Sequence, residues 1–278
     1  QLSAITGPAL GGFLIGVGNG ATAVYFANAA AGMVLVIVLL MLKIKRADFQ
    51  KSAEPPLQAL RAGWRFVKNT QIILASITLD MFAVLFGGAT FLLPIYAKDI
   101  LFVDATGLGL LRAAPSVGAL LMAVYLSRRG SFKQAGRTLL LAVAGFGVAT
   151  IIFGISTSFW LSLIMLGLTG MLDNISVVVR HTLILTYTPD EMRGRVNSVN
   201  YVFIGASNEL GGFESGVAAG LLGAVGAVVF GGIGTLAVVG AVAALSPQLR
   251  RLGSLHEVPD QLAVSDSPAA ESAERLAT

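Results

Sequence analysis

Several ionisable side chains lie inside long apolar stretches of the sequence, where a charge is costly unless it has a partner or a cavity, and four of them are our main candidates. Asp80 and Arg180 each lie roughly 12–15 Å from the nearer end of the stretch, counted at about 1.5 Å per helical residue. Asp173 and Glu209 lie about 20 Å deep by the same count. We predict that Asp80 and Arg180 form an ion pair, or compete for a proton and a substrate.

Asp173 and Glu209 are candidate proton carriers, because an apolar site favours the protonated, neutral form of a carboxyl group. The alternative is that each acid hydrogen-bonds a neighbouring helix and only contributes to packing. Two secondary candidates follow these residues directly. His181 has a side chain that titrates near neutral pH, although a lone membrane histidine also satisfies polar contacts, and Asn174 adjoins Asp173.

The apolar stretches that must position these residues dominate the 278-residue chain. Hydrophobic residues make up 55% of it, charged residues 12%, and the mean hydropathy is +0.79. About 20 apolar residues in a helix cross a bilayer core of roughly 30 Å. We predict an all-α, polytopic membrane bundle whose spans are residues 1–17, 20–42, 71–97, 107–126, 138–157, 159–187, 196–218 and 220–246.

The basic residues gather on one side of the predicted spans. Most of the 19 lysines and arginines fall in the connection 43–70, the connection around 128–137, the pair Arg193 and Arg195, or the C-terminal tail. This asymmetry is the positive-inside pattern, and it predicts an inner-membrane protein with a cytoplasmic C-terminus. The net charge of +4 is therefore a topology signal, and we expect no nucleic-acid partner.

The side chains needed for an enzyme site are scarce. The chain has 2 histidines and no cysteine, so it offers no clustered metal site, cofactor-binding thiolate or cysteine nucleophile. It also has no GxxxxGK[ST] motif, which disfavours an ATP-driven pump. We expect no enzyme activity, no cofactor and no metal.

The polar segments divide the chain. Residues 43–70 form a predicted cytoplasmic linker in which Leu57 and Trp64 lie at helical spacing after a Pro-Pro pair, predicting either an amphipathic helix on the membrane surface or a solvated linker helix. Residues 247–278 are predicted to be a disordered cytoplasmic tail.

A weak internal repeat relates the two ends of the chain. The segment 9–13 reads ALGGF and the segment 209–213 reads ELGGF, so the first two spans resemble the last two. Nested repeats of this kind build many secondary transporters. We predict that residues 71–246 form one six-helix half, that residues 1–42 are the last two helices of the other, and that N-terminal helices missing from the chain are needed for transport.

The first span resembles the fifth-helix motif of exporters of the major facilitator superfamily. It carries Gly7, Pro8, Gly11 and Gly12, with Ser3 where the fuller motif has another glycine. Proline removes a backbone donor and glycines allow close helix contact, so we expect a bend and a tight interface there.

The connection after residue 180 is similar to that between helices 10 and 11 in the enterobactin-exporter-like branch of that superfamily, a branch of drug:proton antiporters. It reads RHT at 180–182 and TPDEMRGRVNSV at 188–199, and the segments 79–83 and 213–216 are similar to the same branch. The resemblance implies proton-coupled export of a siderophore or another small amphipathic molecule across the bilayer. Multidrug efflux, uptake by the same fold and a non-transporting scaffold remain alternatives.

Charges cluster where this connection enters the next span. We predict that Thr188 caps the helix, with Pro189 at its first position, and that Asp190 and Glu191 favour the positive end of its dipole. Arg193 and Arg195 then lie at the interface and are able to pair with these acids. The group either latches a cytoplasmic gate or serves only capping and topology.

Overall fold

The computed structural model describes residues 7, 10, 11, 14, 15, 22–42, 55–129, 132 and 134–253. Every regular element in these residues is helical, and six helices are long and apolar enough to cross a membrane. The α-helices are α2 (Thr22–Met41), α3 (Pro56–Asn69), α4 (Gln71–Phe86), α5 (Leu93–Ile95), α6 (Ala105–Arg129), α7 (Ala135–Ile155), α8 (Phe159–Tyr187), α9 (Asp190–Leu245) and α10 (Pro247–Arg250). The prediction of an all-α membrane bundle is confirmed.

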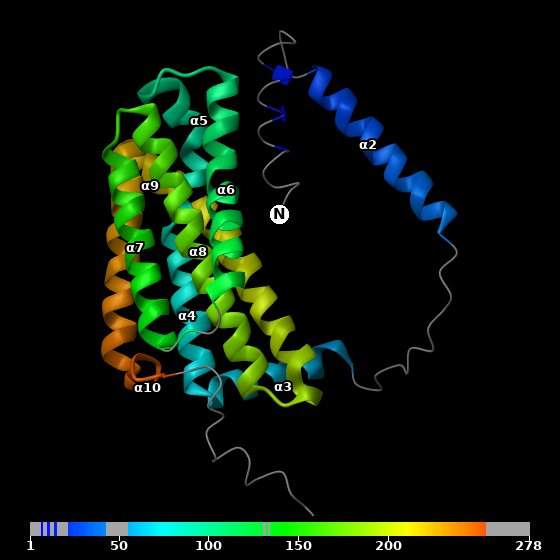
Figure 1. The fold of residues 1–278 in the computed structure, drawn as a ribbon, viewed down its shortest axis with the longest axis vertical. Helices are drawn as coiled ribbons and strands as arrows, with labels where there is room; N and C mark the ends of the chain where they lie inside the picture. Colours follow the sequence, from blue (N-terminus) through cyan, green and yellow to red (C-terminus); the bar gives the residue numbers. More distant parts are fainter. Residues whose placement is uncertain are drawn as a thin grey trace, which may run out of the picture.

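Five of these helices form the bundle that holds the candidate site. Helices α4, α6, α7, α8 and α9 pack side by side, α3 crosses one end, and α2 stands apart (Figure 1). Two clusters of buried apolar residues fill the bundle, one around Val67, Leu139 and Leu183 near α3 and one around Tyr96 and Phe153 near the opposite end. Large apolar side chains also cover the outside, as expected for helices that face lipid.

Glycines bring α6 and α8 into backbone contact. A Cβ at Gly118 would collide with the Gly167 carbonyl, and a Cβ at Gly170 would collide with the carbonyl of Pro115. Small residues allow such close approach, which lets van der Waals contact hold helices together in lipid. This interface fixes the part of α8 that precedes Asp173.

The predicted span 71–97 is interrupted in the structure, which corrects the expectation of one continuous helix. Helix α4 ends at Phe86, a 3₁₀ turn follows at Gly88–Leu92, and a π-helical turn ends the segment at Tyr96–Ile100. The sequence explains the break, because Gly87 and Gly88 weaken the helix and Pro94 removes a backbone donor. A Cβ at Gly88 would collide with the Ser215 hydroxyl, so this turn packs closely on α9.

The predicted spans 196–218 and 220–246 are two parts of α9, joined by a sharp break at Gly223 rather than at residue 219. Gly223 has φ 74° and ψ 166°, a conformation that glycine adopts far more readily than other residues. Gly211, before the break, and Gly231, after it, both pack on backbone carbonyls of the last turn of α4. The chain therefore reverses direction at Gly223.

Helix α3 packs on the end of the bundle, a geometry that neither linker prediction described. Gly63 leaves no room for a Cβ beside the carbonyl of Arg195, and Val67 is fully buried. Trp64 stacks on Phe203 of α9, with ring centroids 5.5 Å apart.

Part of the predicted disordered tail is ordered. Residues 247–250 form α10, and Leu249 is buried against α7, where Gly136 has no room for a Cβ beside the Leu249 carbonyl. Residues 254–278 of that prediction lie outside the described residues.

Candidate functional site

An ion pair lies in the interior of the bundle. Asp80 of α4 and Arg180 of α8 are 5% and 3% exposed, and the Arg180 Nη1 contacts the Asp80 Oδ2. Ser176, about one turn earlier on α8, donates its hydroxyl to the Asp80 Oδ1 at 3.4 Å. The predicted pairing of Asp80 with Arg180 is confirmed, and its part in transport stays a prediction.

The pairing of the two charges explains why they can be buried in an apolar bundle. Each charge alone would lose its hydration without compensation, and a buried pair repays part of that loss through attraction and hydrogen bonds. The same logic makes the pair sensitive, since removing one partner leaves the other charge unpaired.

Asp173 connects this pair to a larger hollow. It lies two helical turns before Arg180 on α8 and lines a small cavity of about 10 Å³ together with Asp80 and Ser176. It also lines a second hollow of about 200 Å³ at the break after α4. Val84 and Phe146 line both spaces as well. Asp173 therefore borders both the larger hollow and the small cavity that Asp80 and Ser176 line.

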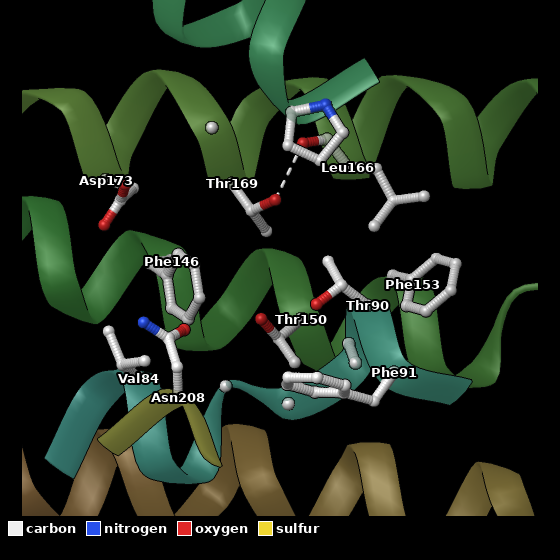
Figure 2. Close-up of a pocket in the computed structure, with 15 residues that line it drawn as sticks. Val84, Thr90, Phe91, Phe146, Thr150, Phe153, Leu166, Thr169, Asp173 and Asn208 are labelled. Atoms are coloured by element: carbon white, nitrogen blue, oxygen red, sulfur yellow. Dashed lines mark hydrogen bonds between the residues drawn. The ribbon is translucent and has the colours of Figure 1, made fainter. Parts of the chain in front are cut away.

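The larger hollow combines aromatic walls with hydroxyl and amide groups (Figure 2). Asp173 is the only charged residue among those described that line it, and no arginine, lysine or histidine does so. Its main side chains are Val84, Thr90, Phe91, Phe146, Thr150, Phe153, Leu166, Thr169, Asp173 and Asn208.

Several polar groups in this lining are available to a ligand. The Thr150 hydroxyl is buried and has no hydrogen-bond partner among the described residues. The Thr169 hydroxyl donates to the Leu166 carbonyl at 2.7 Å, the dashed line in Figure 2. This hydroxyl oxygen keeps its lone pairs and can still accept a hydrogen bond. Hydrogen-bond acceptors and aromatic side chains therefore line the same hollow.

Sequence reasoning missed Thr150, Asn208 and Phe146. These three residues carry no charge, so they did not stand out in the sequence as Asp80, Asp173 and Arg180 did. Thr150 was detectable in principle as an isolated polar residue in the apolar stretch 138–157, and Asn208 as the neighbour of Glu209.

The other predicted pathway residues line neither of the two hollows. Glu209 is exposed on α9 and lines neither hollow. Asn174 is buried with its Oδ1 unpartnered among the described residues, but it too lies outside both linings. His181 is half-buried beside Arg180.

Within the predicted gate group, Arg193 forms an ion pair with Asp190 at the start of α9. Arg193 Nη1 lies 2.6 Å from Asp190 Oδ1, and its Nη2 donates to the Leu185 carbonyl of α8 at 3.1 Å. Arg195 contacts the Met192 sulfur at 3.4 Å, and Glu191 is exposed. A latching function for this group is untested by the structure.

The predicted cap at Thr188 is wrong. Helix α9 begins at Asp190 with Pro189 as its N-cap, and no side chain caps it. Thr188 instead ends α8 with an extended backbone, and its buried hydroxyl has no partner among the described residues. Backbone N–H groups of Met192 and Arg193 donate to the Pro189 carbonyl.

The glycine motif of the first span is only partly described. A Cβ at Gly7 or Gly11 would meet no described atom within 4 Å, so these two glycines make no close contact with a helix among the described residues. Pro8 and Gly12 lie outside the described residues.

A polytopic helical bundle with a buried ion pair beside an amphipathic hollow has the architecture of a membrane transporter. The chain matches the transmembrane secretion effector family of the major facilitator superfamily over residues 1–272, and it belongs to that family. It is 27% identical to the enterobactin exporter EntS of Escherichia coli O1:K1, over 96% of the chain and 63% of the relative. Its identity to EntS of Shigella flexneri is 28%, over 96% of the chain and 62% of the relative.

The chain therefore spans less than two thirds of the length of these curated relatives. No solved structure matches it. This family membership agrees with the resemblance found in residues 180–199. The chain therefore belongs to a family of multi-pass membrane transporters.

Proposed function

We propose that this protein acts as a secondary-active exporter that couples proton movement to the expulsion of a small amphipathic molecule. One observation carries the proposal: Asp173 lies between the amphipathic hollow and the buried Asp80–Arg180 pair. A group in that position can sense both a ligand in the hollow and the charge state of the pair.

Coupling requires that proton and substrate depend on each other's binding. Asp173 is the only charged group among the described residues lining the hollow, so a proton on its carboxylate would neutralise that lining. A substrate donor that binds the carboxylate and a proton would then exclude each other. Movement of the two six-helix halves, 71–246 and the half to which we assign 1–42, would expose the site alternately to each side, with 43–70 as the cytoplasmic linker between them.

For the substrate we propose a siderophore with phenolic hydroxyls. The relatives are named as enterobactin exporters, and the hollow offers acceptor oxygens beside Phe91, Phe146 and Phe153. Phenolic rings have both an apolar face and a hydroxyl donor, so they match this lining. An amphiphilic drug with an aromatic ring and a cationic or donor group is the second candidate, because the hollow has one carboxylate and no basic side chain among its described residues.

The gene that encodes the chain allows a direct test. Deleting it should raise the cellular content of the siderophore and lower the content of the medium, measured by mass spectrometry of both fractions in iron-limited cells. Restoring the gene should reverse the change, and a protonophore should reproduce it. Unchanged distribution of siderophores, with altered retention of a cationic dye, would instead assign the drug substrate; no change in either would contradict export.

A further inference from the structure

Three arginines from two separate elements converge at the end of the bundle where α7 begins and α10 follows α9. Arg137 of α7, Arg250 of α10 and Arg251 line a hollow of about 680 Å³, together with Gln134, Leu252 and Gly253. None of the described residues in this lining is acidic. The proposed transport path does not use this hollow, which lies on the side of α7 next to α10.

The arrangement is held by contacts between α7 and the segment that follows α9. The Ala135 N–H donates to the Gly253 carbonyl at 3.1 Å, and Ala135 and Leu249 are buried. Gly136 is in backbone contact with the Leu249 carbonyl, where any side chain would collide. The backbone that bears the three arginines is therefore closely packed, although each arginine side chain is exposed.

The charges are not compensated within the described part of the chain. Arg137 donates to the neutral Gln134 Oε1 at 3.3 Å, and no described carboxylate pairs with any of the three arginines. Guanidinium groups bind phosphate oxygens with paired N–H donors. A phosphate-bearing anion has the charge and the acceptor oxygens that match this cluster.

Helix α7 indicates where that anion comes from. Leu141, Val148 and Ile155 lie at helical spacing from Arg137 on the same face, and they are 70%, 45% and 64% exposed. An apolar stripe exposed along a spanning helix is a surface for an acyl chain. Arg137 stands at the end of that stripe, at the level where a phospholipid headgroup would lie.

We propose that Arg137, Arg250 and Arg251 form a binding site for the phosphate of an anionic phospholipid whose acyl chain lies along the Leu141 face of α7. Basic pockets at the ends of membrane helices have the chemistry to hold such headgroups. The site would fix the short α10 and the start of α7 to one leaflet of the bilayer.

The test measures lipid retention by the full chain in a neutral detergent, using native mass spectrometry with phosphatidylglycerol or phosphatidylcholine. The variant Arg137→Gln/Arg250→Gln/Arg251→Gln should bind phosphatidylglycerol roughly tenfold to a hundredfold more weakly. The matched control Arg61→Gln/Arg65→Gln/Lys68→Gln removes the same charge from exposed positions of α3 and should retain the preference for phosphatidylglycerol. Replacing the three arginines with lysine should recover part of the affinity.

Equal loss in both glutamine variants, or equal retention of the two lipids by the wild type, would overturn the proposal. Displacement of phosphatidylglycerol by millimolar inorganic phosphate would assign the site to a free anion and overturn the lipid source. Thermal unfolding checks that the variants are folded; if the triple glutamine variant is not, Arg250→Gln alone should still weaken retention severalfold, and unchanged retention would contradict the site.

Discussion

At the residue scale, Asp80 and Arg180 compensate each other in a region that water does not reach. Both are almost fully buried, and Ser176 donates an additional hydrogen bond to the carboxylate. Such a pair contributes little net stability compared with apolar residues of the same size, but breaking it by removing one partner is expensive. This asymmetry gives a way to separate its structural effect from a role in transport.

The single substitution Asp80→Asn should lower stability by about 3–5 kcal/mol, because Arg180 is left as an unpaired buried charge. The double substitution Asp80→Asn/Arg180→Gln removes both charges and should recover most of that loss. Thermal unfolding in detergent measures both effects. If the double variant regains stability and also exports normally in cells, the pair is structural only and plays no part in coupling.

Asp173 gives a prediction about pH. Export driven by inward proton movement should rise as the external pH falls, because the proton gradient grows in that direction. Asp173→Asn removes the proton-binding carboxylate from the hollow and should abolish this dependence, while Glu209→Gln, at an exposed position outside the linings, should keep it. Siderophore efflux measured across a series of external pH values tests the contrast. A normal pH response in Asp173→Asn would remove this residue from the coupling mechanism.

The residues of the site were predictable only where they carried a charge. Asp80, Arg180 and Asp173 stood out because an ionisable group in an apolar span demands an explanation. Thr150 and Phe146 gave no comparable signal, since neither carries a charge and their convergence depends on how α7 packs against α8 and α4. Glu209 was predicted from its depth along the helix, which does not determine which way a side chain points; it lies outside both hollows, and its part in transport stays a prediction.

At the element scale, backbone contact between α6 and α8 sets the position of the site. Gly170→Ala would drive a Cβ into the Pro115 carbonyl, and overpacking of this kind should cost about 1–3 kcal/mol. Gly167→Ala, one turn away on the same helix, would place its Cβ 3.7 Å from the Ala114 carbonyl and should be tolerated. Comparing the melting temperatures of the two variants tests the interface. Equal tolerance would show that α6 and α8 are farther apart than described.

The reversal in α9 depends on one glycine. Gly223→Ala would meet no atom within 4 Å, so its cost should come from backbone strain alone, about 1–3 kcal/mol. Gly220→Ala also meets nothing within 4 Å and has no positive φ, which makes it the matched control. Thermal unfolding of both variants is the measurement. A Gly223→Ala protein as stable as the control would contradict the φ of 74°.

Element boundaries followed from the sequence where the apolar pattern was regular. The stretch 159–187 corresponds to α8 because its polar flanks, Ser158 and Thr188, both adopt extended backbone. The break after Phe86 was missed, since the residues around Gly87 remain apolar and hydropathy does not register a change in helix type. The docking of α3 was missed for a different reason: the contact of Gly63 with Arg195 joins segments far apart in the sequence.

At the scale of the whole molecule, the two ends of the bundle differ in charge. Helix α3, α10 and the start of α9 share one end, with Arg61, Arg65 and Lys68 exposed on α3 (Figure 1). The turn between α7 and α8 lies at the opposite end and exposes Thr157. The positive-inside pattern assigns the basic end to the cytoplasm. Because this assignment comes from charge, it needs a measurement that is independent of charge.

The absence of cysteine from the sequence makes that measurement clean. A single cysteine at Thr157 should react with a membrane-impermeant maleimide in intact cells, whereas a cysteine at Lys68 should react only after the inner membrane is opened. The unsubstituted chain supplies the background, since it has no thiol to label. Both positions are exposed, so a difference between them reports the side of the membrane rather than burial. The reverse labelling pattern would place α3 and the C-terminal end outside the cytoplasm, and it would invert the direction in which the proton gradient acts on Asp173.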